Sequence, residues 1–213
     1  MIAGAADGPV LISVGNSRME QFTGSLVADA EENGWTLITL WMGGCVYAPD
    51  AQVSPECDAW SAQARHYIER VAPDAVVLNS TFLTPERTEI VTPGLEDTLA
   101  DLAGTDVIAV RDLPRMPLHQ ADCVSERGAD DPACAPPLPE ALTAERPDAS
   151  LLAAQGEGVH PVEVNDLVCP EDVCRPVIGN VRVSIDPDHI SASYAASMQD
   201  AVRERLREEG FTW

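Results

Sequence analysis

Short apolar runs alternate along the chain with longer segments in which apolar residues recur every three or four positions. The first run, residues 9–15, is continuous and ends in glycine, as is typical of a buried strand. The next segment, residues 19–34, has Phe22 and Leu26 at helical spacing and ends on Asn-Gly, a helix C-cap signal. The predicted strands are residues 9–15, 36–42, 73–80, 106–112, 160–166 and 181–186. The predicted helices are residues 19–34, 59–72, 94–104 and 191–209, with one or two short helices within residues 138–154.

Alternation of strand and helix over the whole chain predicts an α/β fold. The mostly parallel sheet would carry helices on both faces, as a three-layer α/β/α sandwich. A chain of 213 residues suits one such domain, and neither a repeat nor a linker divides it, so residues 1–213 are predicted to form a single domain. Ligands in these folds bind beyond the carboxyl ends of the strands, so polar residues directly after a strand are the candidates for function.

The amino-acid composition argues against nucleic acid as a binding partner and against a membrane-spanning segment. The formal net charge is −22 and every basic residue is arginine, which argues against nucleic-acid binding because that needs a basic face. The acidity is most simply a solvated surface. No segment reaches the ~20 apolar residues that span a bilayer, and the N-terminus lacks the basic start of a signal peptide.

Six cysteines fall into three sequence-local pairs in loops rich in Pro or Asp. An even number in close pairs favours disulfides and therefore an oxidising compartment. Among the roughly fifteen connectivities that such a set allows, locality favours Cys45–Cys57, Cys123–Cys134 and Cys169–Cys174. Zinc is the alternative, but these spacings are wider than C-x2-C knuckles, and no metal is predicted. Disulfides without a signal peptide suggest an extracytoplasmic domain of a longer, membrane-bound or exported protein.

Two distant segments carry candidate catalytic side chains. Ser17 follows a strand and opens a helix, where a nucleophile would have backbone N–H groups aimed at an oxyanion; a helix N-cap is the other interpretation. His189 is predicted at the start of the last helix, where it could take the proton of Ser17 or be an ordinary exposed histidine. Asp186 is placed to hold the imidazole, whereas Asp188 is expected to be the helix N-cap.

Two further strand ends offer oxyanion donors. Asn79 ends the third predicted strand, and its amide could donate to an oxyanion or serve as a turn residue. Gly43 or Gly44, after the second strand, could supply a backbone N–H or simply form a tight turn.

Taken together, Gly-x-Ser, Gly, Asn and Asp-x-x-His in this order resemble the SGNH hydrolases. More narrowly, the chain is similar to the extracytoplasmic SGNH domain fused behind the membrane acyltransferase-3 domain of bacterial O-acyltransferases. The matching segments cover most of residues 8–200, and the three local cysteine pairs and the final Asp-x-x-His-Ile-Ser are the most specific. They read "VLISVGNSR", "WMGGCVYAPDAQVSPECDAW", "APDAVVLNS", "VIAVRDLPRMP", "CVSERGADDPAC", "VNDLVCPEDVCRPVIGN" and "SIDPDHISASYA".

The resemblance implies a flavodoxin-like fold and an acyl-serine intermediate with no cofactor. By carry-over Ser17 is the nucleophile, His189 the base and Asp186 its orienter, while Asn79, Gly44 and the Ser17 N–H form the oxyanion hole. The implied function is transfer of an O-acyl group, acetyl in the simplest case, from a donor delivered by the membrane domain to a cell-envelope glycan or glycolipid.

The chain departs from the family pattern beside the nucleophile, where Gly-Asp-Ser-His reads Gly-Asn-Ser-Arg. Asn16 keeps the size of Asp without its charge, and Arg18 is a candidate contact for an anionic group of the substrate. Two other functions stay open: an exported carbohydrate O-acetylesterase, and a catalytically inactive glycan-binding domain, which the changes at Asn16 and Arg18 motivate.

Overall fold

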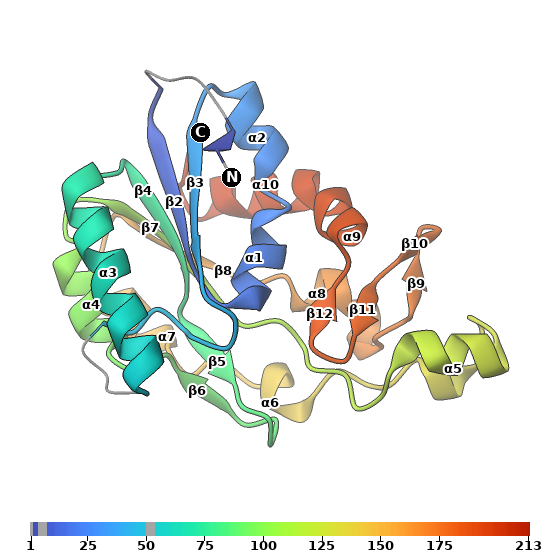
Figure 1. Ribbon diagram of the computed structural model, residues 1–213. Helices are drawn as coiled ribbons and strands as arrows, with labels where there is room; N and C mark the ends of the chain where they lie inside the picture. The colour runs from blue at the N-terminus through green and yellow to red at the C-terminus, as the bar shows by residue number, and fades with distance from the viewer. Residues whose placement is uncertain (1, 4–7, 50–53) are drawn as a thin grey trace.

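A twisted central sheet organises the chain, whose computed structural model describes residues 2–3, 8–49 and 54–213. In this described part the sheet has six strands in the order β1-β3-β2-β4-β7-β8 (Figure 1). All its strands run parallel except the short edge strand β1, which is antiparallel to β3. The strands are β1 (Ile2–Ala3), β2 (Val10–Gly15), β3 (Thr36–Trp41), β4 (Ala75–Asn79), β7 (Asp106–Val110) and β8 (Val159–Val162).

Helices cover both faces of the sheet because both faces are apolar. Successive residues of β4 point to opposite faces, so Ala75 and Val77 join one buried cluster while Val76 and Leu78 join the other. Figure 1 shows the two helical layers on either side of the strands, which confirms the predicted three-layer α/β fold. The first layer holds α1 (Ser17–Thr23), α2 (Val27–Glu32), α9 (Ala192–Ser197) and α10 (Gln199–Glu208), and the second holds α3 (Pro55–Val71), α4 (Leu95–Asp101) and α7 (Ala149–Gln155).

Smaller elements extend from the carboxyl ends of the strands. The pairs β5–β6, β9–β10 and β11–β12 form antiparallel two-stranded sheets. Their strands are β5 (Thr81–Leu83), β6 (Glu89–Val91), β9 (Val177–Ile178), β10 (Val181–Arg182), β11 (Ser184–Asp186) and β12 (His189–Ile190), and the remaining helices are α5 (Gln120–Arg127), α6 (Glu140–Thr143), α8 (Asn165–Val168) and the 3₁₀ turns Pro132–Cys134 and Pro170–Asp172.

Several predicted elements differ in extent from the observed ones, and two of the differences bear on the fold. Residues 181–186 form no strand of the main sheet, because they divide between the β9–β10 and β11–β12 hairpins, and alternating polarity does not distinguish hairpin strands from sheet strands. The predicted helix 19–34 is two helices separated by residues 24–26. Gly24 lies at the break in close contact with α9: a Cβ there would come within 3.2 Å of Ala195 Cβ.

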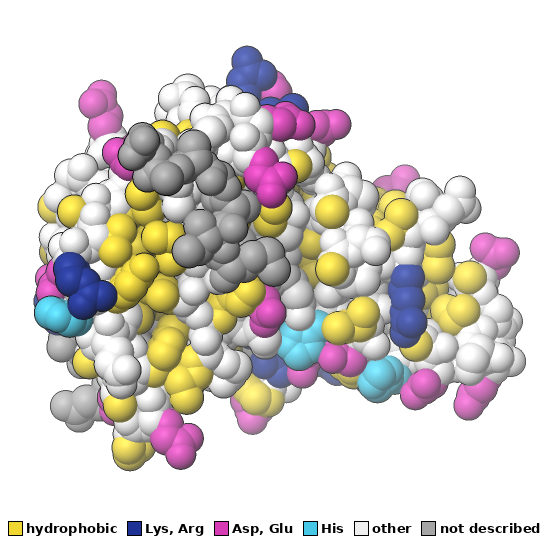
Figure 2. All heavy atoms as spheres, turned by 45° about the horizontal axis from the view of Figure 1, so that its top comes forward, with side chains coloured by type: hydrophobic (Ala, Val, Ile, Leu, Met, Phe, Trp, Pro, Cys, Tyr) yellow, Lys and Arg dark blue, Asp and Glu magenta, His cyan; other side chains and the backbone are white. Residues whose placement is uncertain are grey.

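All three predicted disulfides are present. Cys45–Cys57 joins the loop after β3 to the start of α3, Cys123–Cys134 joins α5 to the 3₁₀ turn Pro132–Cys134, and Cys169–Cys174 follows α8. No helix within the described ranges has the length and apolar character needed to cross a membrane. Acidic side chains outnumber basic ones on the face shown in Figure 2, in keeping with the net charge of −22.

Candidate functional site

The structure brings Ser17, His189 and Asp186 into one hydrogen-bonded chain. Ser17 Oγ lies 2.8 Å from His189 Nε2, across 172 residues of sequence. On the other side of the ring, His189 Nδ1 lies 2.7 Å and 2.9 Å from the two carboxylate oxygens of Asp186. A carboxylate only accepts hydrogen bonds, so Nδ1 donates and Nε2 is left to accept from the Ser17 hydroxyl. This is the arrangement of a serine nucleophile, a base and its orienter.

Asn16, and not Ser17, caps helix α1. Asn16 Oδ1 accepts hydrogen bonds from the backbone N–H groups of Arg18, at 3.0 Å, and Met19, at 3.3 Å. Ser17 is therefore the first residue within the helix, and its hydroxyl is not used for capping. The N-cap interpretation of Ser17 is wrong, and Asn16 is buried beneath the nucleophile with its side-chain oxygen directed to the helix.

His189 lies on strand β12 and not at the start of a helix. The N-cap of α9 is Ser191, whose hydroxyl accepts from the Tyr194 N–H, so the assignment of this cap to Asp188 is wrong. Asp188 instead forms an ion pair with Arg115 at 3.0 Å. Its backbone N–H donates to Asp186 Oδ1 at 2.8 Å, which fixes the carboxylate within the turn.

Two more contacts attach this turn to the body of the domain. The backbone N–H of Ile190 donates to Gln21 Oε1 of α1 at 3.0 Å, and the N–H of Met116 donates to the Pro187 carbonyl at 2.7 Å. Gln21 thus connects the helix of the nucleophile to the strand of the base. Sequence reasoning missed this residue, because nothing in the pattern of α1 distinguishes it from a surface glutamine.

The environment of Asp186 keeps its carboxylate charged. Partial burial alone would raise the pKa of Asp186, but the hydrogen bonds from His189 and the Asp188 N–H outweigh it, and the pKa is lowered. An ionised Asp186 favours a proton on the facing ring nitrogen and stabilises the imidazolium that forms when His189 accepts a proton.

The candidate oxyanion residues lie at the ends of the strands on either side of β2. Asn79 ends β4 and is buried; a Cβ added to Gly15 would come within 2.7 Å of Asn79 Oδ1, so this amide lies directly over the strand end before Ser17. On the other side, the Met42 N–H donates to the Gly15 carbonyl at 3.1 Å, and the exposed turn with Gly44 follows. The positive φ of Gly44, +78°, is one that glycine adopts readily.

Arg18 is buried and does not face solvent as a substrate contact would. Its guanidinium pairs with Asp112 at 2.6 Å and donates to the Leu83 carbonyl at 3.2 Å, and only 3% of the side chain is exposed. Burial raises the pKa of Asp112 to about 6, against the opposing effects of Arg18 and the Leu83 N–H. Burial also lowers the pKa of Arg18. The predicted role of Arg18 in substrate binding is therefore at odds with its geometry, which makes it part of the support under α1.

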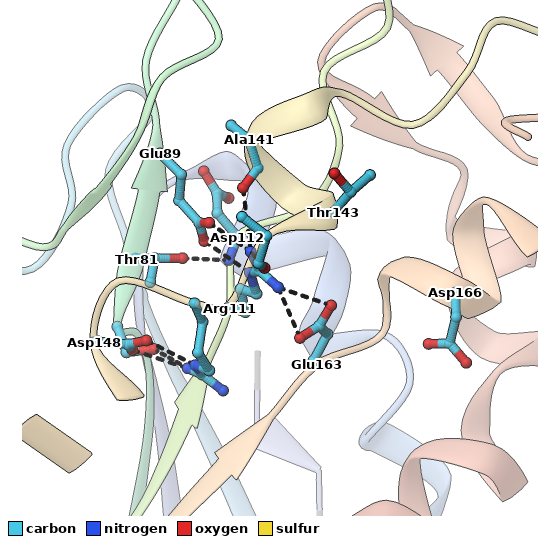
Figure 3. Close-up of polar contacts among 12 residues, drawn as sticks. Thr81, Glu89, Arg111, Asp112, Ala141, Thr143, Asp148, Glu163 and Asp166 are labelled. Carbon is cyan, nitrogen blue, oxygen red and sulfur yellow. Dashed lines mark hydrogen bonds and ion pairs between the residues drawn. The ribbon is translucent and has the colours of Figure 1, made fainter. Parts of the chain in front are cut away.

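A second buried arginine joins the carboxyl ends of β7 and β8 to the start of β6. Arg111, directly after β7, lies between Glu89 of β6 and Glu163 after β8, with separations of 2.7 Å and 3.0 Å (Figure 3). The adjacent Asp112 N–H donates to Thr81 Oγ1 at 2.9 Å. Burial by itself would lower the pKa of Arg111, but its hydrogen bonds to both glutamates outweigh that effect and raise the pKa. Arg111 is thus paired with two carboxylates, and Asp112 is bonded to Thr81. These contacts hold the segments that follow β7 and β8 against β5 and β6.

A cavity of about 550 Å³ opens beside the nucleophile and is lined in part by Ser17 and His189. It lies between α1, the end of β3 and the β11–β12 hairpin, and its other walls are mainly apolar.

Among the described residues, no group of three or more His, Cys, Asp and Glu side chains is placed to hold a metal ion.

A family model and a solved structure each match nearly the whole of this chain. The family model described as "SGNH domain (fused to AT3 domains)" matches residues 2–204. Among solved structures, the chain is similar to the periplasmic domain of the Salmonella ser. Paratyphi A lipopolysaccharide acetyltransferase, with a TM-score of 0.66 and 13% identity over 96% of this chain and 84% of that one. No curated protein sequence matches the chain. At this identity the structural likeness supports the fold alone.

Proposed function

Because the chain belongs to the family of SGNH domains fused to AT3 (acyltransferase-3) domains, we propose that it transfers an O-acyl group through an acyl-enzyme on Ser17. The observation that carries the proposal is the continuous hydrogen-bonded chain from Ser17 through His189 to Asp186. A serine hydroxyl is a weak nucleophile by itself, and an adjacent base in hydrogen-bond contact is what activates it.

In the first step Ser17 Oγ attacks the carbonyl carbon of an activated acyl ester or thioester. The hydroxyl proton passes to His189 Nε2, the bond to the leaving group breaks, and the leaving group departs with that proton. In the second step an acceptor hydroxyl gives its proton to His189 and attacks the acyl-serine. The new ester leaves, and the proton returns to Ser17.

The negative charge on the carbonyl oxygen in both steps needs donors. We assign them to the backbone N–H groups of Ser17 and Gly44 and to the side-chain amide of Asn79. The position of Asn79 over Gly15 and the hydrogen bond between Met42 and Gly15 support this, because both hold the assigned groups at the end of β2.

The acceptor in this proposal is a hydroxyl of a cell-envelope glycan or glycolipid, and a membrane acyltransferase domain delivers the donor. Fusion of the family to AT3 domains supports the membrane partner. Three disulfides support a location outside the cytoplasm. A glycan acceptor also agrees with the structural likeness to the periplasmic domain of a lipopolysaccharide acetyltransferase.

The test is release of acid and of p-nitrophenol from p-nitrophenyl esters by the isolated chain. Ser17→Ala should reduce kcat/KM by at least about 10³-fold and His189→Ala by a similar factor, because a triad acts as a unit. Ser125→Ala, an exposed serine on α5, is the matched control and should behave as wild type. If Ser17→Ala kept the wild-type kcat/KM, Ser17 would be ruled out as the nucleophile.

Hydrolysis is the second candidate function, and the exposure of the base favours it. With 26% of its side chain exposed, His189 can be reached by water as well as by an acceptor hydroxyl. Adding a soluble sugar to the ester assay separates the two: a transferase forms sugar ester at the expense of free acid, whereas an esterase releases free acid at an unchanged rate.

A further inference from the structure

The cavity beside Ser17 is larger and less polar than an acetyl group requires. Its volume is about 550 Å³, within the range of sites for small molecules. An apolar cavity of about 150 Å³ already accommodates benzene, with six carbons. The single methyl group of an acetyl-serine would leave most of this space to water.

Most of the wall is hydrocarbon. The apolar side chains come from α2, β3, the β11–β12 hairpin and the start of α9; they are Val27, Leu37, Trp41, Ile185, Ile190 and Ala192. No lysine or arginine is among the lining residues that the structure describes, so the cavity offers no cation to the carboxylate of a dicarboxylic acyl group. Glu20, exposed at its edge, would repel one.

Several polar groups of the wall already have partners within the protein. Trp41 Nε1 donates to Ser13 Oγ at 3.3 Å, and Thr23 Oγ1 donates to the Met19 carbonyl at 2.7 Å. Gln21 Oε1 accepts from the Ile190 N–H at 3.0 Å. A sugar entering this space would find few hydrogen bonds in exchange for its water, whereas an aliphatic chain needs none.

We propose that this cavity binds the acyl group carried by Ser17, and that this group is a neutral aliphatic chain of about four to eight carbons, not acetyl. The inference rests on the proposed function, since it takes Ser17 as the point of attachment. Because Ser17 lines the cavity, a chain esterified to its Oγ can extend along the apolar wall without leaving the site. The chemistry of transfer is unchanged, and only the selectivity for the acyl group is added.

The first measurement is kcat/KM for p-nitrophenyl acetate, butyrate and hexanoate. Burial of each additional methylene should raise kcat/KM by about fourfold, so hexanoate should exceed acetate by about 10²-fold. Ala192→Trp, which fills the exposed edge of the cavity, should reduce the ratio of the hexanoate to the acetate kcat/KM at least about tenfold. The control is Ser193→Trp, an exposed neighbour that is not among the lining residues, which should keep the wild-type preference.

A binding measurement separates failure of the inference from failure of the proposed function. In Ser17→Ala, methyl hexanoate should shift the Trp41 indole N–H resonance in a saturable way and methyl acetate should not. Absence of that shift, or equal rates on acetate and hexanoate, would overturn the assignment of the cavity. Saturable binding together with full esterase activity in Ser17→Ala would instead keep the cavity and remove Ser17 as the nucleophile.

Discussion

Ser17 and Arg18 are neighbours in sequence but serve opposite sides of the helix that carries them. The Ser17 hydroxyl faces the base at 2.8 Å, while the Arg18 guanidinium turns inward to Asp112 at 2.6 Å. A cation next to a nucleophile invites a role in binding anionic substrates. The Arg18 side chain is buried, however, and Asp112 neutralises its charge beneath the site. An unpaired charge there would cost several kcal/mol.

We predict that Arg18→Met destabilises the domain in a pH-dependent way. Arg18 lowers the pKa of Asp112, which burial nevertheless raises to about 6, so loss of Arg18 should raise it further. Between the ordinary value and this raised value, the folded state binds more protons than the unfolded state, so stability falls as pH rises. Urea unfolding should show a loss of about 3–5 kcal/mol near pH 8 and a much smaller loss near pH 5.

The control for this prediction is Arg175→Met, which removes an exposed pair with Glu171 whose side chains are 46% and 79% exposed. Such a pair contributes at most about 1 kcal/mol, without the steep pH dependence. An Arg18→Met loss that is equal at both pH values would contradict the assignment of Asp112 as the titrating group.

The second prediction at the residue scale concerns the orienter. Asp186→Asn keeps the shape of the turn but removes the charge that stabilises the His189 imidazolium, so ester kcat/KM should fall by about 10²–10⁴-fold with the fold intact. Asp188→Asn, in the same turn but paired with Arg115, should lose far less. Equal losses in the two variants would mean that Asp186 acts only by holding the turn together.

At the scale of elements, the junction of β2 and α1 must meet three geometric conditions for the site to form. The strand must end beside Asn79, the helix must be capped by Asn16, and Ser17 must be left free between them. Gly15 makes this possible, because its φ of +156° and its lack of a side chain allow the Asn79 amide to lie against the backbone.

We predict that Gly15→Ala damages both stability and activity. The new Cβ would lie 2.7 Å from Asn79 Oδ1 and 2.9 Å from Met19 Cβ, so either the amide or the helix must move. The expected cost is about 1–3 kcal/mol, together with a fall in kcat that follows displacement of Asn79. Thermal unfolding of Gly43→Ala, where an added Cβ meets no atom within 4 Å, is the control and should match wild type.

At the scale of the whole molecule, charge and disulfides act in opposite directions. A net charge of −22 on 213 residues repels itself in the compact state, whereas three short cross-links restrict the unfolded chain. The six cysteines lie in segments outside the parallel strands, so the bridges stabilise segments that the sheet does not hold.

We predict that salt stabilises the domain. Raising NaCl from about 0.02 M to about 0.5 M shortens the range of charge repulsion to a few Å, and Tm should rise by a few °C. The same salt change on protein reduced with dithiothreitol should raise Tm similarly, from a lower starting value, because the two effects are independent. A fall in Tm with salt would show that the ion pairs contribute more than the net repulsion costs.

Much of this protein follows from sequence alone, because the relevant physics is local. Continuous apolar runs such as residues 9–15 identify buried strands, and their alternation with helices determines the layered α/β fold. Cysteines 5 to 12 residues apart could be paired correctly because short loops close easily. The placement of Ser17, Asn79 and the Asp-x-x-His segment directly after strands also selected the candidate site.

Other features depended on packing between segments far apart in sequence. Only the tertiary structure decided that Arg18 points to Asp112, that Gln21 holds the strand of His189 and that an apolar cavity lies beside Ser17. The same limit explains why residues 181–186 were assigned to the main sheet. Spacing along the chain determines which face of an element a side chain occupies, but its partner and the empty space beside it are set by elements that arrive from elsewhere in the fold.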